Sequence, residues 1–473
     1  MQDREIPLCV DLDGTLIRSD LLIESALGLL RHNPLYLFRF AGWLLHGKAR
    51  LKREIARRVQ IDVTLLPYEQ RLIDWLRAGE QGQRRRVLCT ASDRSLADAV
   101  AEHVGGFESV LASDGVRNLA GMHKGDTLRA EFGEGGFDYA GNAAPDLHVW
   151  KYARRAIVVN ANPGFARAAQ RRFTVDRVFE REGNHWRAWI KALRVHQWLK
   201  NLLVFLPLLA AHLVLSPAEI ARSGIAFLSF CLCASGVYVL NDLLDLEADR
   251  AHPRKRLRPF ASGTLPLGGG LLAVPLLAGA AIVLAFGLSP RFALILLGYL
   301  ALTTGYTFFL KRVPMLDTVV LAGLYTVRII AGTVAIKVPL SFWLLAFSMF
   351  LFFSLAMVKR YTELQTLLQT GANQSARGYH VDDLALIQSL GAASGYLSVL
   401  VLALYINSSA SEMLYHRPQV LWLLCPALLY WISRTWLLAH RGAMHDDPVV
   451  FAVSDWVSQV LLALCAIVII GAV

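Results

Sequence analysis

The sequence NDLLDLEADRAHPRKRLRP, residues 241–259, follows a long apolar run and decides the fold of this chain. At about 100° per residue, Asp242, Asp245 and Asp249 lie within roughly 60° of one another on one helix face. Three carboxylates at a membrane boundary repel one another and lose hydration. With Asn241 they form an oxygen-rich cluster that suits Mg²⁺, with substrate phosphates completing the coordination shell. The alternative is a solvated helix end whose charges pair with the arginines that follow.

A basic stretch comes directly after these carboxylates. Arg254, Lys255, Arg256 and Arg258 are residues of the type that holds phosphate oxygens, and neighbouring prolines stop the helix from continuing. The same residues also fit a cytoplasmic loop, because basic residues concentrate on that side of a membrane. We predict that the three aspartates are catalytic metal ligands and that the basic stretch binds phosphate.

The composition agrees with a membrane protein that carries a soluble part. Of 473 residues, 55% are hydrophobic and 18% are charged, which excludes an ordinary soluble globular protein, a disordered tail and a fibrous repeat. The net charge is +11, from 48 Lys and Arg against 37 Asp and Glu, and the basic side of a membrane protein explains it. We expect no nucleic-acid partner, buried thiols for the six cysteines, and no signal peptide at the charged start.

Nine apolar windows after residue 198 are long enough to cross a bilayer, which takes about 20 residues. They are residues 199–215, 222–242, 270–288, 291–310, 315–335, 340–358, 389–409, 418–438 and 453–473. With this count every strongly basic loop falls on the side of the N-terminal part, and such loops face the cytoplasm. We therefore expect a multi-pass protein of the cytoplasmic (inner) membrane, in contact with the lipid bilayer, with its N-terminal domain in the cytoplasm.

The N-terminal part, residues 1–180, alternates strand-like and helical stretches, which predicts an α/β domain with a parallel sheet. The strand-like stretches are residues 6–12, 86–89, 109–112 and 157–160. Asp11 and Asp13 end the first strand, where such sheets place their sites, and they suit an aspartyl nucleophile, an acid or base, and Mg²⁺. Residues 21–46 are predicted to form a helical cap near the membrane surface. An amphipathic approach at 181–198 leads to an all-α membrane domain at 199–473.

The motif NDxxDxxxD at the end of a second apolar window resembles the first aspartate-rich motif of the UbiA-type intramembrane prenyltransferase superfamily. The resemblance covers roughly residues 190–473. It implies a helical bundle in which this motif binds Mg²⁺ and a diphosphate, in a cavity open to the cytoplasmic side. A second aspartate motif is expected after the sixth window, but that loop reads KRYTEL from Lys359 to Leu364 and contains one carboxylate.

The cationic residues in that loop suit an additional phosphate better than a second metal. Together with RVHQWLKN at 194–201, the chain resembles the decaprenyl-phosphate phosphoribosyltransferase branch of the superfamily. This resemblance implies phosphoribosyl pyrophosphate as donor and a polyprenyl phosphate lipid as acceptor. Candidate phosphate ligands are Lys200, Lys359, Arg360 and Arg377, and candidates for binding ribose or a second ion are Tyr361 and Glu363. For the basic residues, a topological role is the alternative.

The motif DLDGT at 11–15 resembles motif one of haloacid dehalogenase-like phosphatases, which have a Rossmann-type sheet. Thr90 matches the phosphate-binding hydroxyl of that family, and Lys124 matches its basic residue. Where the family has GDxxxD, this chain has Gly141-Asn142 and keeps Asp146, so one metal-binding charge is missing. Asp11, Asp13 and Asp146 are the implied metal ligands. The domain either removes a phosphate from the lipid-linked phosphoribose or serves as a scaffold.

Three other functions compete with this interpretation. An aromatic or quinone-precursor prenyltransferase would need the second aspartate pair. A transporter would place its charged site at mid-depth rather than beside a basic loop at the membrane edge. A membrane-anchored phosphatase would not need nine spans. Within the apolar windows, Asp317 and Arg328 fit either a functional site or an ion pair with a neighbouring helix.

Overall fold

The computed structural model describes residues 6–78, 83–115, 117–370, 377–444 and 448–473. It divides into two compact units. The first joins Met1–Leu193 to Tyr238–Pro275, and the second joins Arg194–Val237 to Leu276–Val473. The segment 238–275, which the sequence assigned to the membrane domain, therefore packs within the first unit together with the aspartate motif.

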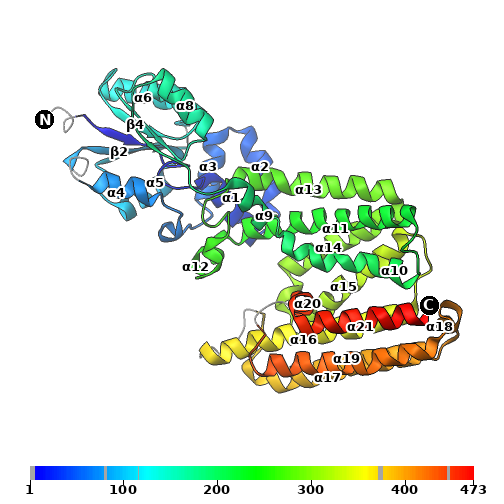
Figure 1. The fold of residues 1–473 in the computed structure, drawn as a ribbon. Coiled ribbons are helices and arrows are strands. Elements are labelled where there is room, and N and C mark those ends of the chain that lie inside the picture. The colour runs from blue at the N-terminus through cyan, green and yellow to red at the C-terminus, as the bar shows by residue number, and fades with distance from the viewer. Residues whose placement is uncertain (1–5, 79–82, 116, 371–376, 445–447) are drawn as a thin grey trace. The chain divides into compact units, whose positions relative to one another are not determined.

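A six-stranded sheet in the order β3-β2-β1-β4-β5-β6 forms the centre of the first unit, and every strand pair is parallel (Figure 1). The strands are β1 Leu8–Val10, β2 Arg86–Asp93, β3 Ser109–Ser113, β4 Asp138–Gly141, β5 Ala156–Val159 and β6 Val175–Phe179. The prediction of a parallel sheet is confirmed, whereas β4 and β6 were not among the predicted strands. The order changes direction between β1 and β4, and this switch point is where open α/β sheets bind ligands.

Helices cover both faces of this sheet because successive strand residues point to opposite sides. Leu8 and Val10 of β1 pack in the cluster that contains the apolar residues of α4 (Gln70–Arg77) and α5 (Arg94–Val104). Cys9, between them, packs in the cluster of the other face. That second cluster contains residues of α6 (Met122–Phe132), α7 (Leu147–Trp150) and α8 (Pro163–Arg172).

Residues 21–56 form three helices after β1, namely α1 (Leu21–His32), α2 (Tyr36–Leu45) and α3 (Lys48–Ala56). The expected helical insertion is therefore present, and Pro34 lies between the first two helices. No residue of α2 is buried, and Phe38 and Leu45 are 77% and 88% exposed. An exposed apolar face of this kind suits a lipid surface, and the location of this insertion at the membrane stays a prediction.

The C-terminal part is helical throughout its described elements, as predicted. Among the described residues, seven helices are long and apolar enough to cross a membrane. They are Pro217–Leu244, Leu267–Leu288, Pro290–Phe308, Leu316–Ala335, Phe342–Gln369, Val381–Ile406 and Pro418–His440. The prediction of nine was wrong in number, because the first and last windows form shorter apolar helices, Val195–Ala210 and Trp456–Ala472. At 1.5 Å per residue, the last of these is shorter than the roughly 30 Å of a hydrocarbon core.

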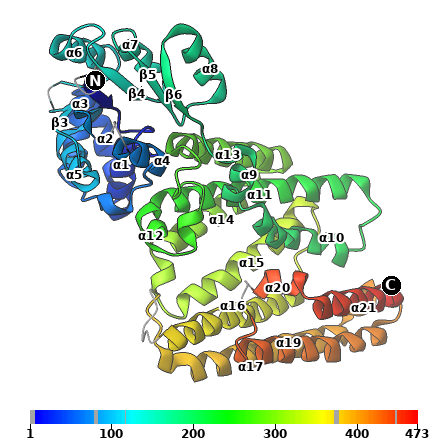
Figure 2. The same ribbon diagram turned by 60° about the vertical axis from the view of Figure 1, so that its left-hand side comes forward.

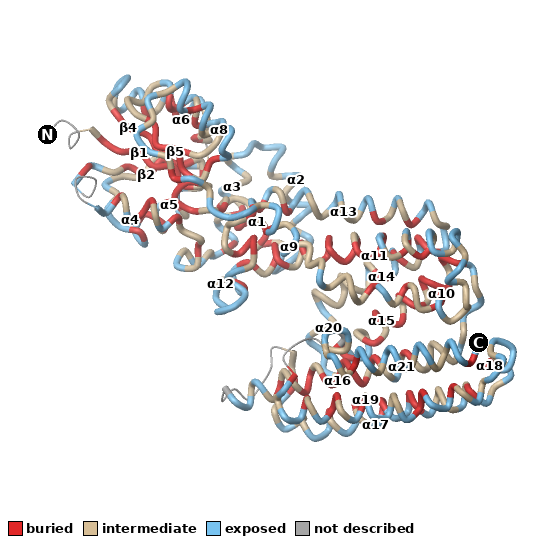
Figure 3. Tube along the Cα trace, viewed as in Figure 1, coloured by how far each residue is buried: buried red, intermediate tan, exposed pale blue. Residues whose placement is uncertain are grey.

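Close packing in the second unit depends on small residues where helices approach. In Figure 2, α16 (Phe342–Thr370), α17 (Leu384–Ile406) and α19 (Leu424–His440) run side by side. A Cβ atom at Gly391 of α17 would lie 2.3 Å from the ring of Trp436, so only glycine permits this approach. Large apolar side chains such as Leu397 and Leu437 remain exposed on these helices, and Figure 3 shows exposed and buried residues alternating along them.

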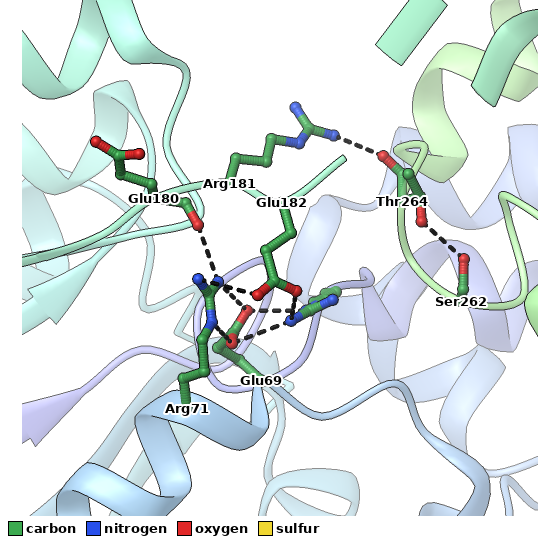
Figure 4. Close-up of polar contacts among 8 residues, drawn as sticks. Glu69, Arg71, Glu180, Arg181, Glu182, Ser262 and Thr264 are labelled. Carbon is green, nitrogen blue, oxygen red and sulfur yellow. Dashed lines mark hydrogen bonds and ion pairs between the residues drawn. The ribbon is translucent and has the colours of Figure 1, made fainter. Parts of the chain in front are cut away.

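A buried carboxylate joins the elements near the end of β6 in the first unit. The side chain of Glu69 has no exposed surface, and Arg18 Nε and Arg71 Nε each donate to it at 2.8 Å (Figure 4). Glu182 accepts further contacts from the same two arginines, at 3.1 Å and 3.3 Å. The four charges balance, so Arg18 and Arg71 are neutralised within this network.

The Glu69 network predicts acid sensitivity of the first unit. Burial alone would raise the pKa of Glu69, but hydrogen bonds from Arg71 and Arg18 lower it to about 2. Because that pKa lies below the unfolded value of about 4.3, Glu69 stabilises the fold above about pH 4. This contribution is lost as the pH falls toward about 2. We expect Glu69→Gln to reduce the free energy of unfolding of this unit by about 2 kcal/mol at neutral pH and to weaken its pH dependence below pH 4.

Hydrogen exchange of the sheet amides in the full chain measures this effect in the first unit alone. Glu108→Gln is the matched control, because its carboxylate is 58% exposed and pairs with the exposed Arg85. Equal protection of the sheet amides in both variants would contradict the role assigned to Glu69.

Candidate functional sites

The aspartate motif lies where α11 (Pro217–Leu244) ends and α12 (Leu246–Ala251) begins. Asp242 and Asp249 are both buried, and one atom, Arg258 Nη1, lies 3.2 Å from the first carboxylate and 2.6 Å from the second. Asp245 interrupts the helix, is partly exposed, and lies 3.7 Å from Arg31. The structure therefore brings two of the three carboxylates together and not the third. The prediction that all three aspartates share one face of a continuous helix is therefore wrong.

The oxygen atoms of the aspartate motif determine whether a divalent ion can bind there. In the described part of the chain, no group of three His, Cys, Asp or Glu side chains is placed to hold a metal. Nevertheless, Asn241 Oδ1 is buried without a hydrogen-bond partner, and Asn241 directly precedes Asp242 in the sequence. An unsatisfied amide oxygen and two carboxylates are the hard oxygen ligands that Mg²⁺ prefers, and such an ion usually keeps water or substrate oxygens as well. These residues fit Mg²⁺, with Arg258 supplying positive charge to the carboxylates in this structure.

The basic stretch separates into two kinds of residue. Arg254, Lys255 and Arg256 are exposed around a short 3₁₀ turn, Lys255–Leu257, and their positions suit contact with an anionic ligand. Arg258 instead pairs with the motif's own carboxylates, so the structure gives it a different contact from the predicted phosphate. Sequence reasoning also missed a buried ion pair, in which Arg250 Nη2 lies 2.7 Å from Glu24 on α1.

A second polar cluster lies in the second unit, around the buried Arg360. Its guanidinium contacts Asp317 at 2.6 Å and Glu363 at 2.5 Å. The hydroxyl of Tyr306 accepts from Arg360 at 3.2 Å and from Arg377 at 2.8 Å, and Arg377 lies 3.7 Å from Glu363. Three predicted ligands, Arg360, Glu363 and Arg377, are thus brought together. Asp317 forms the alternative foreseen for it, an ion pair with a neighbouring helix.

Three other predicted residues belong to the second unit. The hydroxyl of Tyr361 pairs with His440 Nδ1 at 2.9 Å, so its polar atom contacts α19. Lys200 Nζ lies 5.8 Å from the ring centre of Tyr325, a cation–π contact. Lys359 is partly buried. Tyr379, which donates to Asp317 at 2.5 Å, was not singled out by sequence because it comes from a distant loop.

A large apolar cavity of about 930 Å³ also lies in the second unit. Several helices of the second unit line this cavity. The lining residues include Leu206, Phe347, Leu402, Leu428 and Cys465. Walls of this composition suit a hydrocarbon chain.

The N-terminal candidate residues meet at the carboxyl ends of β1, β2 and β4. Lys124 Nζ lies 2.7 Å from Asp11 Oδ1 and donates to the Tyr139 hydroxyl at 2.9 Å, and that hydroxyl donates to Asp146 at 3.0 Å. Asp13 accepts a hydrogen bond from Thr90 at 3.3 Å. The structure thus assembles all five predicted residues.

The electrostatics of this site explain its need for positive charge. Burial raises the pKa of Asp11 to about 7; Lys124 opposes the shift, while Asp146 and Asp13 add to it. Burial alone would lower the pKa of Lys124, but the neighbouring carboxylates of Asp11 and Asp146 raise it above its usual value. In this structure Lys124 supplies that charge to Asp11, and the carboxylates of Asp11, Asp13 and Asp146 do not form a three-ligand metal group among the described residues. Asn142 packs against Gly14, where φ is +77° and an added Cβ would lie 2.0 Å from the amide nitrogen.

Sequence reasoning missed a second lysine in this region. Lys52 of α3 donates to the Ala91 carbonyl at 2.6 Å and to Asn118 at 2.9 Å, and burial lowers its pKa despite the nearby Asp13 and Asp20. Nothing in the helical pattern of α3 distinguishes this lysine from its neighbours, so only the fold reveals it.

Comparisons with known proteins agree with the helical part. A model of the UbiA prenyltransferase family matches residues 203–468. An uncharacterized protein of Sinorhizobium fredii is 37% identical over 98% of this chain and 90% of its own length. A decaprenyl-phosphate phosphoribosyltransferase of Mycolicibacterium smegmatis is 34% identical over 58% of this chain and 88% of its own. A solved UbiA homolog from Archaeoglobus fulgidus, bound to GPP and Mg²⁺, aligns with a TM-score of 0.46 at 15% identity, over 60% of this chain and 99% of that chain.

Proposed function

Because the chain belongs to the UbiA prenyltransferase family and is an integral membrane protein, we propose that it transfers 5-phosphoribose from phosphoribosyl pyrophosphate to a polyprenyl phosphate. The observation that carries this proposal is the buried pair Asp242 and Asp249, which converge on Arg258. The unsatisfied Asn241 directly precedes this pair in the sequence, and an exposed basic stretch follows it. Relatives named as decaprenyl-phosphate phosphoribosyltransferases support the choice of the transferred group and of the acceptor. We place the protein in the cytoplasmic membrane, with its N-terminal domain in the cytoplasm.

In this reaction the bond from ribose C1 to the pyrophosphate oxygen breaks, and a bond from C1 to an oxygen of the lipid phosphate forms. Asp242, Asp249 and Asn241 would hold Mg²⁺, which supplies positive charge to offset that of pyrophosphate. Arg254, Lys255 and Arg256 bind and orient phosphate oxygens of the donor. The acceptor phosphate is already an anion, so it attacks without a general base and inorganic pyrophosphate leaves.

The acceptor lipid needs an apolar site for its chain. The cavity of about 930 Å³ in the second unit provides walls of that kind, and Arg360 and Arg377 belong to the same unit. Both arginines are already paired with carboxylates. We therefore assign them to positioning a phosphate through hydrogen bonds more than through net charge, with Lys200 and Lys359 as further candidates. Tyr361 and Glu363 remain candidates for binding ribose or a second ion.

For the N-terminal domain we propose phosphatase activity on the lipid-linked phosphoribose, in agreement with its resemblance to haloacid dehalogenase-like enzymes. The specific support is the buried contact of Asp11 with Lys124, beside Asp13, Thr90 and Asp146. Asp11 attacks the phosphorus of the 5-phosphate, and the ribose hydroxyl leaves with a proton from Asp13. Water then hydrolyses the aspartyl phosphate, which releases inorganic phosphate and restores Asp11. A scaffold without activity is the competing proposal.

Membranes that contain the full chain test the transferase proposal against its main rival. One reaction receives labelled phosphoribosyl pyrophosphate and polyprenyl phosphate, and a parallel one receives 4-hydroxybenzoate and a prenyl diphosphate. We expect labelled lipid from the first reaction and no prenylated aromatic product from the second. Prenylated aromatic product, with no labelled lipid, would favour an aromatic prenyltransferase and refute the proposal.

A further inference from the structure

A cavity of about 400 Å³ lies in the first unit, at the carboxyl edge of the sheet. Asp13 lines one part of it, and Arg181, directly after β6, lines another. A wall comes from the loop at residues 263–268, which follows the aspartate motif in sequence and leads into α13 (Leu267–Leu288). The cavity next to the phosphatase-like residues is therefore completed by a segment from outside the α/β sequence.

Arg181 differs from the other arginine in this cavity wall. Arg18 is neutralised by Glu69 and Glu182. Arg181 donates to the backbone oxygen of Thr264 at 3.3 Å, and none of the described carboxylates lies within ion-pair distance of it. Burial lowers the pKa of Arg181. A partly buried arginine without a counter-ion, beside a cavity, indicates an anionic ligand.

The remaining wall limits what that ligand can be. Ile23, Pro266 and Leu267 give the cavity an apolar side, so the ligand is amphipathic. Asp13 and Asp20 also line the cavity and repel a densely charged anion. A phosphodiester carries one negative charge and presents two free oxygens, which match one guanidinium.

We propose that this cavity recognises a sugar that carries two phosphate groups, a terminal phosphate and a phosphodiester. Arg181 binds the phosphodiester, and the terminal phosphate reaches Asp11 and Asp13. The apolar side then receives the first carbons of a lipid ester. This inference rests on the proposed phosphatase function for the terminal phosphate, and it adds Arg181 and the loop at 263–268 as the determinants of specificity. Arg181 is a binding residue here, because it touches the diester and not the bond that breaks.

Binding measurements on the full chain in detergent test the inference without turnover. The Asp11→Asn background stops hydrolysis, and the probes are ribose 5-phosphate and its derivatives that carry a methyl or geranyl phosphodiester at C1. We expect the methyl diester to bind about 10-fold more tightly than ribose 5-phosphate. Arg181→Gln should remove that advantage and leave ribose 5-phosphate unaffected, whereas Arg181→Lys should restore part of it.

The control variant is Arg187→Gln, because that arginine is exposed on α9 (His185–Ala192). Equal affinities for the methyl diester and ribose 5-phosphate would overturn the role of Arg181, and a geranyl diester no tighter than the methyl one would overturn the lipid assignment. Phosphate release by the unmodified chain is measured separately. Absence of release combined with Arg181-dependent binding would reject the phosphatase function alone.

Discussion

Replacement of Asp242 by alanine is expected to lower phosphoribosyl transfer to lipid by about 1000-fold. Asp242 is buried and shares Arg258 with Asp249, so its removal takes away half of the acidic pair that is proposed to hold Mg²⁺. Labelled phosphoribosyl pyrophosphate and polyprenyl phosphate, with product counted in the lipid fraction, give the rate. Asp249→Ala should have a similar effect, because the two carboxylates act as one site.

Protein stability is not expected to explain this loss. Arg258 keeps Asp249 as a partner in the Asp242→Ala variant, so no buried charge is left uncompensated. The matched control is Glu247→Ala, which removes an exposed carboxylate from α12. Turnover near that of the unmodified protein in both aspartate variants would refute the metal-binding role.

Asp11→Asn is expected to reduce phosphate release by at least about 1000-fold, if the N-terminal domain is a phosphatase. An amide lacks the nucleophilic oxygen anion, and the buried contact with Lys124 loses its charge. Release of inorganic phosphate from an aryl phosphate measures the effect. The full chain is needed, because the segment 238–275 packs within the same unit and lines the adjoining cavity.

The matched control is Asp126→Asn, an exposed carboxylate on α6, the helix that carries Lys124. This variant should keep full phosphate release. If the unmodified chain releases no phosphate with any divalent metal, the phosphatase proposal is refuted and a scaffold role is supported.

Short-range sequence patterns predicted the first strand, the aspartate pair and the long apolar helices. The strand-like run at the start led to Asp11 and Asp13 at the end of β1, and the aspartate spacing placed Asp242 and Asp249 within reach of one atom. Apolar length identified the long helices. It overcounted them, because a hydropathy window does not register that the first apolar stretch is largely a 3₁₀ helix, Val195–Phe205.

Contacts between distant residues were beyond the reach of those patterns. Arg258 was predicted to bind phosphate, since no periodic rule shows that its side chain turns back to the carboxylates before it. Tyr139 and Lys52 join the N-terminal site through the sheet and through a helical insertion. Arg181 belongs to no sequence motif, and only its position in the cavity wall distinguishes it from other arginines.

The ion pair between Glu24 and Arg250 has a consequence for how such proteins can be divided between genes. Both side chains are almost fully enclosed, at 6% and 7% exposure, and they come from opposite sides of the predicted domain boundary. If fission separated the two coding regions, each product would keep one enclosed charge without its counterpart. A polypeptide made of the C-terminal part alone would need another residue at the position of Arg250, or a separate polypeptide that supplies the carboxylate.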